Sequence, residues 1–178
     1  VIMEYPKWIC YPRCIEHPEW VEDVAAIFRK HKSTICSINN HCKSDEVLEI
    51  IRQDLESVGF LVEGGMGLAD KTPSFFGEYG EPELQYQIDS YNPIKKIGLE
   101  VEAGRSKLGN ALYRDIIQTA LLVGVDYFVV AVPQKYRYLS SGKQFEESIY
   151  LICKSILDAI YGTTRFPLPF RNTVLISY

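Results

Sequence analysis

Apolar residues recur along the chain with two different periods, which predict both helices and strands. Helical spacing predicts an amphipathic helix over residues 18–31. A second helical stripe begins behind Ser44, an expected N-cap, and Gly59 ends it. A short strand is predicted at 60–63 directly after that helix. The Pro- and aromatic-rich stretch 5–12 is expected to lie irregularly on the surface.

Helix and strand patterns continue through the rest of the chain. An apolar stripe predicts a helix over 107–123, and a continuous apolar run over 126–132 is typical of a buried parallel strand. A final helix is predicted over about 144–161 and a last strand over 172–177. The glycine-punctuated stretch 64–80 predicts either a functional loop or a hairpin with a disordered tip.

Two predicted strands in the middle of the chain carry acidic residues at alternating positions. In the segment 84–89, Asp89 falls on the polar face, and in the segment 97–102, Glu100 and Glu102 do so. If these strands are neighbours, the three carboxylates converge on one side of a sheet. Converging carboxylates form a hard-oxygen site suited to Mg²⁺ or Mn²⁺. The alternative is a solvated sheet face, on which three acids would repel one another without a cation.

The order of elements from residue 44 to 132 is helix, strand, strand, strand, helix, strand. Such an order predicts an α/β fold with a central mixed sheet flanked by helices. The 178 residues suit a single domain, 1–178, whose core lies at about 44–132. A hydrophobic share of 47% and a charged share of 24% exclude a disordered chain. The net charge of -4 argues against a uniformly basic nucleic-acid coat but allows a local basic surface.

Five cysteines and the absence of export or membrane signals bear on the compartment. The first residues lack a signal-peptide pattern, and no run of 18 apolar residues occurs, so a cytoplasmic protein with reduced thiols is expected. Two Cys/His groups fit no standard zinc spacing, and ordinary thiols are expected there in place of a structural Zn²⁺ site. The groups are Cys10, Cys14, His17 and Cys36, His41, Cys42.

The element order, with Asp89 on the second strand and Glu100-x-Glu102 on the third, resembles the PD-(D/E)xK nuclease superfamily. Glu102 stands where that superfamily usually has Lys, which resembles the branch of type II restriction endonucleases that includes BamHI and BglII. The segment 97–132 is also similar to bacterial proteins described only as restriction-endonuclease-like. The chain departs from the superfamily's name at Ile88, where the name has Pro.

The resemblance implies a restriction-endonuclease-like αβββαβ core and a Mg²⁺-dependent endonuclease, with Mn²⁺ as a substitute. Asp89 and Glu100 would hold the metal, and the carbonyl of Val101 is a further candidate ligand. Glu102 would orient or deprotonate the attacking water, or help to bind a second metal. Glu63, at the end of the preceding strand, is a candidate outer carboxylate; the alternative for it is a plain surface acid.

Basic and polar residues follow the carboxylates and suit phosphate contacts. For each of them the alternative is a solvated helix face. A second basic and aromatic patch, 135–138, suits either a nucleic-acid backbone or a dimer contact. The candidate nucleic-acid-binding residues are Arg105, Lys107, Asn110 and Arg114.

Together these features predict a metal-dependent endodeoxyribonuclease of type II restriction type, which hydrolyses phosphodiester bonds of double-stranded DNA. Cutting both strands with one site per chain favours a twofold homodimer. One alternative is a non-catalytic or partner-dependent protein of the same fold that binds nucleic acid or protein. Another is a structural or interaction protein whose acidic face is incidental.

Overall fold

The computed structural model describes residues 5–64, 72–103 and 110–178 of the chain. The helices are α1 (Trp20–Lys30), α2 (Lys32–Ile35), α3 (Ser44–Ser57), η1 (Glu78–Gly80), α4 (Ala111–Ala120) and α5 (Ile149–Gly162). The strands are β1 (Trp8–Tyr11), β2 (Leu61–Val62), β3 (Thr72–Phe76), β4 (Pro82–Tyr86), β5 (Ser90–Asn92), β6 (Ile97–Val101), β7 (Tyr127–Val132), β8 (Tyr136–Ser140), β9 (Lys143–Glu147) and β10 (Asn172–Ser177).

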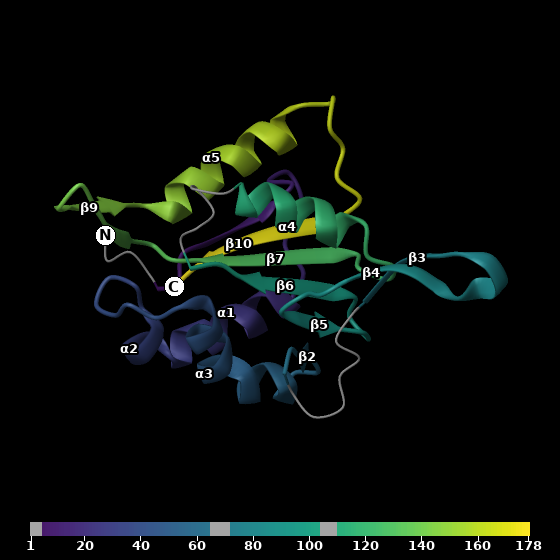
Figure 1. Cartoon of the computed structure of the whole chain (residues 1–178), viewed down its shortest axis with the longest axis horizontal. Coiled ribbons are helices and arrows are strands. Elements are labelled where there is room, and N and C mark those ends of the chain that lie inside the picture. Colours follow the sequence, from purple (N-terminus) through teal and green to yellow (C-terminus); the bar gives the residue numbers. More distant parts are fainter. Residues whose placement is uncertain (1–4, 65–71, 104–109) are drawn as a thin grey trace.

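A mixed six-stranded sheet forms the centre of the molecule, in the order β1-β10-β7-β6-β5-β2. Strands β6, β7 and β10 run parallel, while β1, β5 and β2 pair antiparallel with their neighbours. Helices α1, α2 and α3 cover one face of the sheet, and α4 and α5 cover the other (Figure 1). The prediction of an α/β fold with a mixed central sheet and flanking helices is therefore confirmed.

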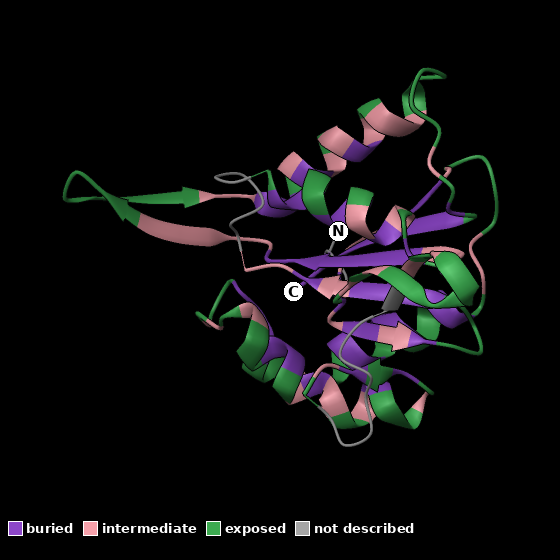
Figure 2. Cartoon of the chain, turned by 45° about the vertical axis from the view of Figure 1, so that its right-hand side comes forward, coloured by how far each residue is buried: buried purple, intermediate pink, exposed green. Residues whose placement is uncertain are grey.

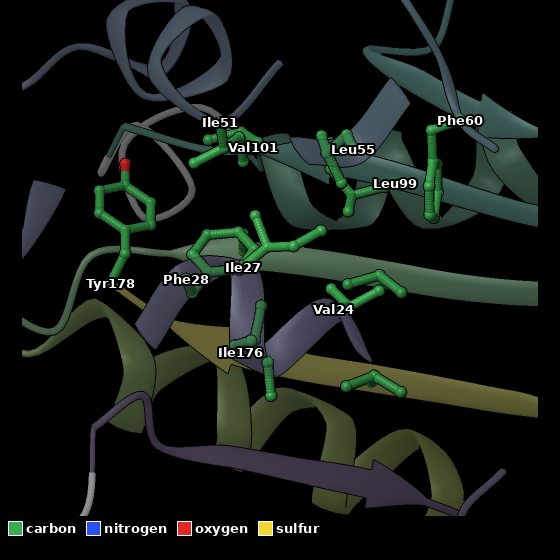
Figure 3. Packing of buried hydrophobic residues seen from close by; sticks show 14 of the residues in the cluster. Val24, Ile27, Phe28, Ile51, Leu55, Phe60, Leu99, Val101, Ile176 and Tyr178 are labelled. Carbon is green, nitrogen blue, oxygen red and sulfur yellow. The ribbon is translucent and has the colours of Figure 1, made fainter. Parts of the chain in front are cut away.

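Strict alternation along the central strands divides the core into two layers. On β6, Leu99 and Val101 point toward α1 and α3, where they meet fully buried side chains such as Phe28 and Ile51 (Figure 3). On β7, Phe128 and Val130 point the other way, toward α4 and α5. The apolar stripes predicted for α1 and α3 form the helical side of the layer that contains Leu99 and Val101.

Two hairpins extend beyond this core. Strands β3 and β4 pair with each other, as do β8 and β9, and the two arms lie at opposite ends of the view in Figure 1. Figure 2 shows the β8–β9 arm on the left as exposed or half-buried, whereas the central strands are buried. Of the stretch 64–80, residues 72–76 form β3, which pairs with β4, while residues 65–71 lie outside the described residues. None of the described helices has the length and apolarity needed to cross a membrane.

Three local expectations were wrong. The stretch 5–12 is not irregular, because β1 pairs with β10 and Tyr11 is buried beneath α5. The segment 84–89 is not one strand: β4 ends at Tyr86, and the chain then crosses to β5 in the main sheet. Residues 143–147 pair with β8, so the final helix begins at Ile149 and not near residue 144.

Candidate functional site: a carboxylate centre beside a basic cleft

Glu100 lies on β6 with its side chain toward α4, one position beyond Leu99, which faces the opposite layer. Helix α4 comes close to this strand because Gly98 has no side chain. A Cβ at Gly98 would lie 3.2 Å from the methyl group of Thr119 and 2.6 Å from the side chain of Ile88. Thr119 is thus placed over Gly98, and the residue one helical turn earlier, Asp115, is placed over the Glu100 end of the strand.

Asp89 lies beside Glu100, although it belongs to the bend before β5 and not to a strand. The pairing of Ser90 with Leu99 brings the two acids next to each other. The backbone N–H of Val101 donates a 2.7 Å hydrogen bond to Asp89 Oδ2. The carboxyls of Glu100 and Asp89 lie close enough for each to act on the pKa of the other.

Glu63 lies on the outer side of Asp89. Its backbone N–H donates a 2.8 Å hydrogen bond to the Asp89 carbonyl, and its carboxylate accepts a hydrogen bond from the side-chain amide of Gln87. The charge of Glu63 reaches Asp89 and raises its pKa. This position next to the centre is the one expected of an outer carboxylate.

Glu102 and Asp115 form a second carboxyl pair. The Glu102 side chain is 12% exposed, and the Asp115 side chain, on the inner face of α4, is 3% exposed. The two carboxyls lie within hydrogen-bonding reach of each other. Arg114 donates to Asp115 Oδ1 from Nε at 3.0 Å and from Nη2 at 2.9 Å, and its Nη2 lies 3.5 Å from Glu102 Oε1.

The backbone at Glu102 is fixed independently of its side chain. Pro133 follows β7 and has no N–H to continue the parallel ladder. The hydroxyl of Tyr178 donates instead to the carbonyl of Glu102, at 2.6 Å. Figure 3 shows the Tyr178 hydroxyl turned away from the apolar cluster that its ring joins. The position of Glu102 therefore depends on the last residue of the chain.

Crowding of the acids raises their pKa values. Burial raises the pKa of Asp89 to about 6, and the charges of Glu63 and Asp115 add to the effect. Burial raises the pKa of Glu102 to about 8, helped by its contact with Asp115. The pKa of Glu100 also lies well above its ordinary value because of burial and the charges of Asp89 and Asp115. A centre of this kind favours protons or another cation among its oxygens.

A cleft of about 550 Å³ opens beside the second carboxyl pair, at the carboxyl ends of β6 and β7. Ligands of open α/β sheets commonly bind at such strand ends. Glu102 and Arg114 line the cleft together with the α2–α3 connection and the start of β8. Its cationic side chains are Lys43, Arg114, Lys135 and Arg137.

Some of these cations are already neutralised. Lys135 and Arg137 both bind the carboxylate of Glu146 on β9, at 2.6 and 2.8 Å. This pairing places the predicted basic patch 135–138 at the root of the β8–β9 arm, beside the cleft. Lys43 is exposed and forms no ion pair with any residue that the structure describes, so it is available to an anionic ligand.

The other predicted contact residues are placed as follows. Asn110 is exposed and directly precedes α4, with a left-handed backbone at φ 53°. Arg114 is 60% exposed yet bound to Asp115, so it belongs to the centre as much as to the helix surface. Arg105 and Lys107 lie outside the described residues, as does the start of the helix predicted from 107.

Asp115 is the site residue that the sequence reasoning missed. It follows Leu112 by three residues and precedes Thr119 by four, so it lies on the buried stripe of its helix. A charged residue on such a stripe is uncommon unless it is paired, and this was the available signal. Among the cleft residues of the α2–α3 connection, the sequence singled out His41 and Cys42 only as members of a Cys/His group.

Within the described ranges, no three His, Cys, Asp or Glu side chains are arranged to ligate a single ion. The carboxyls are instead arranged as two pairs. Mg²⁺ is usually held in proteins by one or two carboxylates, with waters and substrate phosphates completing its shell. A buried carboxyl pair is therefore a donor set that fits this cation.

The two Cys/His groups near the N-terminus are dispersed. Cys10 packs in the core next to Asn172, Cys36 is buried, and the thiol of Cys42 donates to the Thr34 carbonyl. His17 packs against Trp8.

No protein-family model matches this sequence, and no curated protein is significantly similar to it.

Proposed function

We propose that this chain is a divalent-metal-dependent nuclease that hydrolyses phosphodiester bonds in DNA. One observation carries the proposal: two buried carboxyl pairs lie next to each other, and Glu102 and Arg114 of this group line a cleft that also presents Lys43, Lys135 and Arg137. Acidic groups would hold a cation there, and the cationic groups next to them would hold the phosphate backbone that the cation acts upon.

The arrangement of elements supports the same proposal. The order α3, β2, β5, β6, α4, β7 is an αβββαβ series, with the β3–β4 arm inserted between β2 and β5. Asp89 and Glu100-x-Glu102 occupy neighbouring positions in that series, as they would in a restriction-endonuclease-like core. We include the twofold homodimer in the proposal, because one centre per chain cuts one strand at a time.

Each side chain has a role that its position suits. Asp89 and Glu100 would hold the cation, which in such sites polarises the phosphate and acidifies a water. Glu102, at the border between the centre and the cleft, would orient the attacking water. Arg114 is placed to offset charge that develops on the phosphate. Lys43 would hold a neighbouring phosphate of the strand.

A plasmid assay tests this proposal. Purified protein is incubated with supercoiled plasmid and phage genomic DNA, with Mg²⁺, with Mn²⁺, or with a chelator. We expect nicking or linearisation that requires the metal and is lost in Asp89→Ala. Asp126→Asn is the matched control, since Asp126 pairs with Lys96 and Arg171 away from the centre. Absence of cleavage with either metal, or cleavage that persists in Asp89→Ala, would contradict the proposal.

A second candidate function is binding of nucleic acid without cleavage. It is favoured by the ion pair of Arg114 with Asp115, which already neutralises part of the acidic centre. In that case the protein would retard DNA in a gel, with or without Mg²⁺, and leave it intact. Replacing the DNA with RNA of the same sequence in both assays defines the class of nucleic acid.

A further inference from the structure

Asp115 is a buried carboxylate with half of its hydrogen-bonding capacity unmet. Arg114 supplies both hydrogen bonds to Oδ1. No described N–H or hydroxyl group donates to Oδ2, and the side chain is only 3% exposed. Buried polar atoms in folded proteins almost always have partners, so an unmet carboxylate oxygen indicates a ligand or an ordered water.

A second carboxyl, that of Glu102, lies next to Asp115, since the same nitrogen, Arg114 Nη2, is 2.9 Å from Asp115 Oδ1 and 3.5 Å from Glu102 Oε1. Two carboxyls at hydrogen-bonding distance need a proton or a cation between them. Arg114 thus contacts both carboxyls, yet none of the described residues donates to Asp115 Oδ2. The unmet oxygen and the neighbouring acid are two separate observations that indicate the same class of ligand.

We infer that Glu102 and Asp115 form a second divalent-cation site, next to the one assigned to Asp89 and Glu100. Asp115 is thus a metal ligand contributed by helix α4, outside the strand motif. The two pairs are close enough for Asp115 to act electrostatically on both Asp89 and Glu100. Paired metal sites of nucleases support both the attacking and the leaving oxygen of the phosphate. This inference rests on the proposed function.

The close packing of α4 on β6 gives the second site its rigidity. Gly98 permits the approach, and Thr119 contacts the strand one turn after Asp115. At the other side, the Tyr178 hydroxyl fixes the backbone of Glu102. Ligands from a helix and a strand end are thereby held on two ordered elements, as a preorganised metal site requires.

Counting Mn²⁺ ions per chain tests the inference. Calorimetry and electron paramagnetic resonance of the full chain at pH 8 measure the stoichiometry without substrate or turnover. We expect the wild type to bind two Mn²⁺ ions whose resonance spectra show coupling between them. Asp115→Asn should bind one Mn²⁺, or bind the second with at least tenfold lower affinity. Glu102→Gln removes the other half of the same pair and should give the same result. Asp126→Asn is the control and should bind two.

The outcomes separate this inference from the proposed function. Equal stoichiometry and affinity in the wild type and Asp115→Asn would overturn the second site. A single Mn²⁺ in the wild type that is lost in Asp89→Ala would also overturn it, while leaving the nuclease proposal intact. No Mn²⁺ binding by the wild type would contradict both.

Discussion

The two faces of the central sheet are built from the same strands, yet one is mostly apolar and the other carries the acids. Strand β6 contributes to both, with Leu99 and Val101 on one side and Gly98 and Glu100 on the other. The layer against α1 and α3 is mostly apolar, and its buried polar side chains, such as Asn92 and Asn172, are uncharged. The layer against α4 and α5 is apolar beneath α5 but contains Asp115 and Glu100 beneath α4. A period of two thus lets one strand contribute apolar packing on one face and acidic groups on the other.

The largest expected effect is on the apolar face. Phe28→Ala removes a fully buried ring from the cluster in Figure 3, and we expect a loss of about 3–5 kcal/mol in unfolding free energy. Denaturant titration measures it. Phe75→Ala, in the β3–β4 arm and 47% exposed, is the control and should change stability by less than about 0.5 kcal/mol. A loss below about 1 kcal/mol for Phe28→Ala would show that this layer is not well packed.

The next effect is on the acidic face and concerns rate. Glu102→Ala should reduce DNA cleavage at least about 100-fold, equivalent to about 2.7 kcal/mol of transition-state stabilisation. The fold should not be destabilised at pH 8, because Tyr178 binds the backbone of Glu102 and not its carboxylate, and the substitution removes one of the crowded acids. Glu49→Ala is the control, since Glu49 is 69% exposed and paired with Arg52. Wild-type cleavage by Glu102→Ala would remove this residue from the mechanism.

The sequence predicted the regions where local pattern and final structure agree. Helices α1 and α3 and strands β6, β7 and β10 follow from periodicity alone, and β10 was predicted to the residue. Adjacent placement of Asp89 and Glu100 also followed, although Asp89 lies in a bend. These features depend on side-chain alternation within a few residues, which a single sequence records directly.

The features that were missed depend on distant partners. Strand β1 exists because it pairs with β10 at the other end of the chain, and β9 exists because it pairs with β8. Alternation continues past Tyr86, and nothing local marks the change of sheet there. The role of Asp115 depends on the close approach of α4 to Gly98, which only the three-dimensional packing reveals.

A smaller effect should appear in the pH dependence of stability. The raised pKa values of Asp89, about 6, and Glu102, about 8, mean that the native state binds more protons than the unfolded state between about pH 4 and 8. The stability of the metal-free protein is therefore fully present below that range and falls as the pH rises through it. We expect a loss of at least roughly 1 kcal/mol from pH 5 to pH 8. Urea titrations across this range measure it, and a flat or rising profile would contradict the assignment.

The smallest effect should come from the cleft. Lys43→Ala removes one phosphate contact, so the log–log salt slope of DNA binding should fall by about 0.9, alike for all sequences. Fluorescence anisotropy at several salt concentrations measures this slope. Lys95→Ala is the control, because Lys95 pairs with Asp23 on another part of the surface. Equal slopes for Lys43→Ala and the wild type would place the DNA elsewhere.

The central claim is the proposal that a divalent cation binds among the acids of the acidic face and stabilises the fold. Thermal unfolding of the wild type and Glu100→Gln at pH 8, with increasing Mn²⁺, tests it most directly. Without metal, Glu100→Gln should unfold at the higher temperature, because one of the crowded acids is gone. Saturating Mn²⁺ should raise the midpoint temperature of the wild type, because at 100 times Kd the bound metal adds about 2.7 kcal/mol to the free energy of unfolding. The midpoint temperature of the variant should rise much less. A wild-type midpoint that does not respond to Mn²⁺ or Mg²⁺ would contradict the account.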